Sequence, residues 1–168
     1  MNANKRKIEY VRNFIFGVED SLVSTIGLVA GVAVAGLSNK GVVLTGMVLI
    51  FVEAFSMGVG SLLSENSAEE FEGKKEVSLS GDIGYALVMF VSYLVTGFII
   101  VAPYMFLSRT GALWTSIAVA VVGLFLLGVW SGKVARVHWL KRACTMAFIG
   151  GVTILLGIIV GQLVNGDR

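Results

Sequence analysis

The sequence is poor in charge, cysteine and histidine. Only 14% of its 168 residues are charged, against roughly a quarter in soluble domains. The single cysteine, Cys144, excludes an internal disulfide, and with only His138 beside it no zinc-type Cys/His cluster can form. The net charge of +2 is too small to indicate nucleic acid. No nucleophile–base pair or cofactor loop indicates an enzyme. What is present is apolar: 56% of the residues are hydrophobic and the mean hydropathy is +0.86, as in a membrane protein.

Five apolar segments are long enough to span a membrane. About 20 mainly apolar residues cross roughly 30 Å of hydrocarbon, and each segment must be helical because lipid offers backbone groups no partners. The first segment is too long for a signal peptide and is expected to be retained. We therefore predict an all-α integral membrane protein, one domain over residues 1–168, with a short acidic cytoplasmic loop at 64–82. The expected spans are residues 14–36, 41–63, 83–107, 112–132 and 143–164.

The basic residues predict the orientation of these spans. Segments rich in Lys and Arg stay on the cytoplasmic side. Ten of the 13 basic residues precede the first span or lie between the second and third or the fourth and fifth spans. The other three, Lys40, Arg109 and Arg168, fall on the opposite side. The N-terminus is therefore expected in the cytoplasm and the C-terminus outside or in a lumen, with a prokaryotic plasma membrane as the expected location.

Two pairs of glycines bear on how the helices pack. Gly27 and Gly31 in the first span, and Gly157 and Gly161 in the fifth, have the spacing that lets helices approach closely. Such spacing serves either packing within one chain or a seam between two chains. Because five spans cannot divide into two equal halves and no internal repeat is visible, a transport pathway would need two subunits. We therefore expect a homodimer in the lipid bilayer.

Three polar residues of the first two spans are predicted to meet. Asp20 and Met57 each lie six residues from the cytoplasmic end of their span, about 9 Å below that boundary at 1.5 Å per residue. Glu53 lies one turn deeper than Met57 on the same helix face. If the first two helices are neighbours, the three side chains face one chamber. Glu19 is a further candidate, but it lies about 100° around the helix from Asp20.

Two carboxylates and a thioether form a donor set for a divalent transition ion. Oxygen donors alone suit magnesium or calcium, whereas an added soft sulfur favours later metals such as iron(II), with manganese(II) tolerated. Carboxylates in a low-dielectric site also bind protons, so metal and proton can displace each other. The metal and protons are cargo, and no permanently bound cofactor is expected.

Each of these residues also has a structural interpretation. Met57 can be core filler, and Asp20 can be a loop or cap residue if the first span begins later. For Glu53 the structural interpretation is the weakest, because a carboxylate in mid-span usually faces a pathway or a specific partner. A hydroxyl partner in the bundle would come from one of four residues: Ser24, Thr25, Ser56 or Ser92.

The sequence around these residues resembles the vacuolar iron transporter family. FIFGVEDSLVSTIGLVAGVAVAG (14–36) is similar to the family's first span, which reads close to G-x-x-D-G-L-V-S, and AFSMGVG (54–60) is similar to its A-x-S-M-x-x-G segment. The glycine-punctuated stretches at 90–104, 124–134 and 150–163 resemble its last three spans, so the resemblance covers most of the chain.

The resemblance implies a homodimeric five-span carrier that moves iron(II), often manganese(II), out of the cytoplasm in exchange for protons. It implies metal-binding roles for Asp20 and Met57, a pathway between the two first spans, and a vacuolar membrane if the source is eukaryotic. The family's glutamate would fall at Leu49; Glu53, one turn away on the same face, is either a substitute for it or a separate proton site. Many members also insert a metal-collecting helical domain where this chain has only residues 64–82. The alternatives are a nontransporting membrane scaffold and a carrier of another cation.

Overall fold

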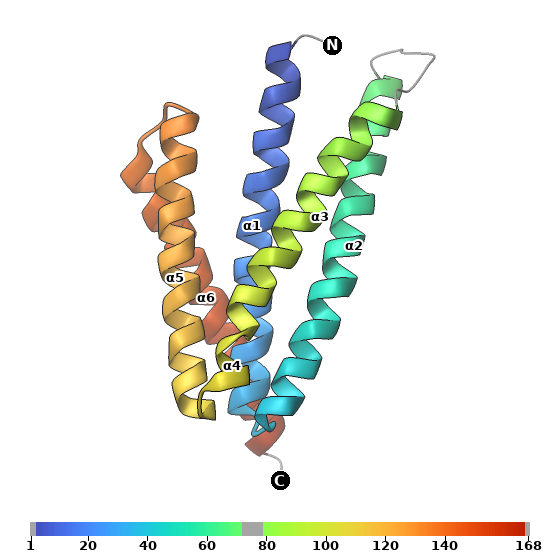
Figure 1. Ribbon diagram of the computed structural model, residues 1–168. Helices are drawn as coiled ribbons and strands as arrows, with labels where there is room; N and C mark the ends of the chain where they lie inside the picture. The colour runs from blue at the N-terminus through green and yellow to red at the C-terminus, as the bar shows by residue number, and fades with distance from the viewer. Residues whose placement is uncertain (1–2, 72–78, 167–168) are drawn as a thin grey trace.

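The computed structural model describes residues 3–71 and 79–166. Within those ranges every regular element is a helix, and five of the six helices are long and apolar enough to span a membrane. The start of α1, the end of α2, the start of α3 and the α5–α6 connection lie at one end of the bundle, and the end of α6 lies at the other (Figure 1). The helices are α1 (Ala3–Val34), α2 (Asn39–Phe71), α3 (Leu79–Val101), α4 (Pro103–Phe106), α5 (Arg109–Val134) and α6 (Trp139–Gly166).

The helices confirm the five predicted segments but are longer than most of them. α1 begins at Ala3, eleven residues before the expected span, and α2 continues to Phe71. The acidic stretch after the second span is therefore helical in its first half. Its later carboxylates, Glu72 and Glu76, lie outside the described residues.

The expected third span, 83–107, is interrupted near its end. Pro103 has no backbone N–H to donate and disfavours a helical residue before it, and α3 ends at Val101. The chain resumes as the single turn of α4, with Pro103 in its first turn. The sequence analysis missed this break because hydropathy stays high across the proline.

α1 is the central helix, and glycines on α1 and α6 let the two backbones pack closely. It contacts α2, α3, α5 and α6. A Cβ on Gly31 would lie 2.7 Å from the carbonyl oxygen of Gly157, and one on Gly157 or Gly161 would overlap the carbonyl oxygen of Gly27 or Gly31. The two small-residue motifs therefore pack against each other within one chain, which decides between the two interpretations left open by the sequence.

Hydroxyl groups join α1 to α3 in the interior. The Ser21 hydroxyl donates to the backbone oxygen of Tyr93 at 2.7 Å, and the Ser24 hydroxyl bonds the Tyr93 phenol at 2.6 Å. Tyr93 is fully buried. Because buried polar groups without partners are costly, these bonds fix the rotation of α1 relative to α3, and with it the direction in which the neighbouring Asp20 points.

The end of the bundle that carries the C-terminus is tied together by polar contacts. Asn39, at the start of α2, donates to the carbonyl oxygens of Tyr104 at 3.2 Å and Leu107 at 2.8 Å. Arg109 of α5 donates to the carbonyl oxygen of Leu37 at 3.3 Å. The α1–α2 turn itself requires Gly36, whose φ of 91° is accessible mainly to glycine. Four elements are thus joined at this end.

The outward faces of the helices are apolar. Leu44 and Phe55 on α2 and Phe148 on α6 are among the many large hydrophobic side chains that are exposed. Exposed apolar surface on this scale is incompatible with water but normal for lipid. The protein is a multi-pass integral membrane protein.

Candidate metal site

The structure brings Asp20 and Glu53 into electrostatic contact across α1 and α2. Both side chains are half-buried; the charge of Glu53 acts on Asp20, and both carboxylates act on the Tyr93 phenol. Ser24, one turn from Asp20 on the same face of α1, holds that phenol. Two carboxylates in a low-dielectric setting repel each other unless a cation or proton lies between them.

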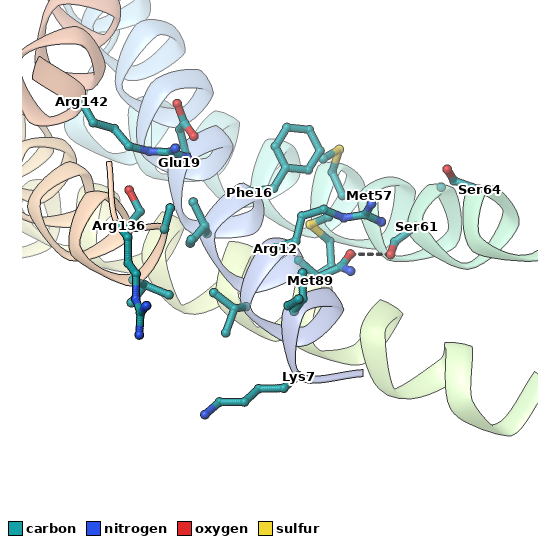
Figure 2. Close-up of a pocket in the computed structure, with 18 of the residues that line it drawn as sticks. Lys7, Arg12, Phe16, Glu19, Met57, Ser61, Ser64, Met89, Arg136 and Arg142 are labelled. Atoms are coloured by element: carbon teal, nitrogen blue, oxygen red, sulfur yellow. Dashed lines mark hydrogen bonds between the residues drawn. The ribbon is translucent and has the colours of Figure 1, made fainter. Parts of the chain in front are cut away.

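Met57 lies one turn from Glu53 on α2 and lines a cavity of about 1450 Å³. The cavity lies in the half of the bundle nearest the N-terminus, between α1 and the ends of α2, α3, α5 and α6. In Figure 2, Met57 extends from α2 and Met89 from α3 toward α1. Asp20 and Glu53 do not line the cavity. The three residues predicted to share one chamber are therefore split: the carboxylate pair is coupled, and the thioether of Met57 faces the adjoining cavity.

Glu19 faces away from this pair, as its helical position predicts. It lies against Arg142 of α6, whose charge acts on it (Figure 2). Glu19 also lines both the large cavity and a smaller one of about 530 Å³ beside α6. Its carboxylate therefore has a basic partner within the chain, which Asp20 and Glu53 lack among the described residues.

Two further residues of α3 belong to this region and were not predicted. Met89 is buried and adds a second thioether to the wall that holds Met57. The Tyr93 phenol feels the charge of both carboxylates. Neither stands out in the sequence, because an isolated Met or Tyr in an apolar helix is ordinary. Gly17 brings α3 this close, since a Cβ there would lie 2.9 Å from the carbonyl oxygen of Met89.

The donor set of one chain is small. Within residues 3–71 and 79–166, no three His, Cys, Asp or Glu side chains converge on a point that could hold a metal. Leu49, one turn before Glu53 on the same face of α2, supplies no donor. A single chain thus offers two carboxylates, with thioethers nearby.

Comparison with known protein families shows to which family a chain with this arrangement belongs. A model of the VIT family matches residues 11–79 and 74–162, which together cover nearly all of the chain. The chain belongs to the vacuolar iron transporter (VIT) family. No individual curated protein matches it.

Membership of the VIT family indicates a metal-ion transporter, and a transporter rather than an enzyme. The two matched segments meet at 74–79, in the connection between α2 and α3. Both matched segments contain elements of the site: α1 and α2 in the first, and α3 in the second.

Proposed function

We propose that this VIT family member moves iron(II), manganese(II) or both out of the cytoplasm in exchange for protons. The observation that carries the proposal is the coupling of Asp20 on α1 to Glu53 on α2, with Met57 one turn away. In this proposal Asp20, Glu53 and Met57 bind the ion, and Glu19 remains paired with Arg142.

The chemistry of these groups supports a transition metal. The carboxylates attract any divalent cation, whereas a thioether contributes little to magnesium or calcium and more to later metals. A carboxylate pair that holds a metal when ionised holds a proton when the metal leaves. Proton entry from the far side would therefore release the metal, and metal entry from the cytoplasm would release the proton.

The small donor set supports a homodimer. Manganese(II) and similar ions commonly take about six ligands, more than the donors that one chain brings together. A second copy that placed its own α1 opposite the first would double the donors. Because the α1–α6 glycines are occupied within the chain, the contact between copies would involve other faces of α1 and the exposed face of α2.

Transport into proteoliposomes tests the proposal. The purified protein is reconstituted, and iron(II) or manganese(II) uptake is followed with a trapped metal-sensitive dye under an imposed proton gradient. We expect proton-dependent flux that Asp20→Ala and Met57→Ala abolish, while Lys40→Gln, at the opposite end of the bundle, transports normally.

The same assay separates the alternatives. A folded, dimeric protein that gives no flux under any proton gradient would be a scaffold and would contradict the proposal. Flux that persists in Met57→Ala would indicate a carrier of another cation, because the sulfur would then play no part in selection.

A further inference from the structure

The large cavity is lined by basic groups, which is unexpected in a cation carrier. Its charged lining consists of one carboxylate, Glu19, and four basic side chains: Lys7, Arg12, Arg136 and Arg142. A divalent cation resident among four basic groups would be repelled. The mouth of this cavity is therefore suited to an anion.

Two of the four basic groups lie close to carboxylates. Arg12 forms ion pairs with Glu9 at 3.0 Å and with Glu65, and the charge of Arg142 acts on Glu19. Lys7 and Arg136 form no ion pair with any residue in the described ranges. In Figure 2 their charged ends point toward the same open side of the cavity. They are the groups left to bind a ligand.

The rest of the wall is apolar and exposed. Ile8, Phe16 and Val134 line the cavity and are 64%, 50% and 49% exposed. From Lys7 to Glu19 the cavity follows α1 for about 18 Å at 1.5 Å per residue, from the end of the span into its apolar part. The volume of about 1450 Å³ exceeds the roughly 300–1,000 Å³ typical of small-molecule pockets. An anion with a long apolar portion fits this wall better than a small free anion.

The backbone at Arg136 supports a role for its side chain. α1 and α5 end in the same kind of turn, with matching bonds from Leu37 to Val32 and from Val137 to Gly132. In the first turn the left-handed residue is Gly36, but in the second it is Arg136, with φ of 55°. A side chain is disfavoured in this conformation. An arginine therefore stands at a position where glycine would be less strained, and it lines the cavity.

We propose that the cavity binds an anionic phospholipid, with its phosphate at Lys7 and Arg136 and an acyl chain along Ile8 and Phe16. Basic pockets between transmembrane helices commonly hold anionic headgroups. The same two basic side chains could also bind free phosphate, but free phosphate would leave the apolar wall of the cavity uncovered. The inference concerns binding alone and does not depend on the proposed transport.

Native mass spectrometry of the full-length protein in detergent tests the proposal. The probes are phosphatidylglycerol, phosphatidylcholine with matched chains, and inorganic phosphate. We expect adducts with phosphatidylglycerol that exceed those with phosphatidylcholine. In Lys7→Gln/Arg136→Gln the apparent affinity should fall by roughly fivefold for each charge removed. Ile8→Ser should also weaken lipid binding, whereas Lys40→Gln should leave it unchanged.

Three results would overturn the proposal. The first is equal phosphatidylglycerol binding by the wild type and the double variant. The second is an unchanged affinity in Ile8→Ser together with inorganic phosphate competing at similar concentration, which would assign the site to a free anion. The third is loss of binding in Lys40→Gln as well, which would indicate binding by general surface charge.

Arg136→Gly relaxes the turn, so a drop in its lipid affinity without a drop in thermal stability would support a binding role and exclude a purely structural one.

Discussion

At the scale of single residues, Glu53 is the feature that most distinguishes this chain from the family pattern. The expected position of the family carboxylate holds Leu49, one turn away on the same face of α2. A shift of one turn moves a side chain by about 5.4 Å along the helix axis. The charge of Glu53 nevertheless acts on Asp20, as the proposed metal site requires.

If Glu53 substitutes for the family carboxylate, a carboxylate at position 49 should support transport in its place. Glu53→Gln should lower metal flux by at least about tenfold, the loss that even supporting residues of metal sites produce. The double variant Leu49→Glu/Glu53→Leu should recover part of that flux, because it restores a carboxylate on the same face. Flux in proteoliposomes provides the measurement. Full activity in Glu53→Gln would show that the carboxylate is not needed for transport.

Tyr93 is expected to position Asp20 through Ser24. Tyr93→Phe removes the phenol that bonds the Ser24 hydroxyl, so it should cost about 1 kcal/mol of stability. It should also weaken metal binding, because of the two bonds that fix the rotation of α1 against α3 only the Ser21 bond to the Tyr93 backbone then remains. Thermal unfolding and manganese(II) titration measure the two effects separately. Tyr85→Phe, a buried tyrosine elsewhere on α3, is the control for metal affinity, and an equal loss in both variants would contradict the positioning role.

At the scale of helices, the glycine contact between α1 and α6 is the tightest feature of the fold. Gly157→Ala would place a methyl group against the carbonyl oxygen of Gly27. Backbone cannot move aside as a flexible side chain can, so we expect a loss of about 1–3 kcal/mol. Gly151→Ala, also on α6, meets nothing within 4 Å and should unfold at the wild-type temperature. Thermal unfolding in detergent compares them, and equal transitions would contradict the packing.

The helices themselves were readable from the sequence, whereas their contacts were not. Hydropathy located five spans because lipid requires long apolar helices. It could not place the break at Pro103, where hydropathy stays high, or choose between packing within a chain and between chains for Gly27 and Gly157. Those outcomes depend on which helix faces meet in space.

The site was predictable to a similar extent. Charge in an apolar segment singles out Asp20 and Glu53, because such residues are costly and rare in lipid. Nothing comparable marks Met89 or Tyr93, which are ordinary in an apolar helix and gain their role only from the packing of α3 against α1. The separation of Met57 from the carboxylate pair also depends on side-chain direction, which helical spacing alone does not give.

At the scale of the whole molecule, the orientation in the membrane is predicted from the end of the bundle that gathers the basic residues. The start of α1 and the segments around the α5–α6 connection, which carry eight of the ten basic residues expected on the cytoplasmic side, lie at one end (Figure 1), and Lys74 and Lys75 lie outside the described residues. In a Cys144→Ser background, Lys133→Cys should react with an impermeant thiol reagent only from the cytoplasmic side, and Lys40→Cys only from the other. Labelling of intact and inverted vesicles measures this. The reversed pattern would contradict the proposed direction of transport.

The two ends of the bundle also differ in access. Asn39 and Arg109 tie the helices together at the end near the C-terminus, whereas the large cavity opens at the other. With the proposed orientation, the bundle has its large cavity at the cytoplasmic end and is closed by polar contacts at the far end. In the proposed transport, release of the ion on the far side would require these contacts of Asn39 and Arg109 to break.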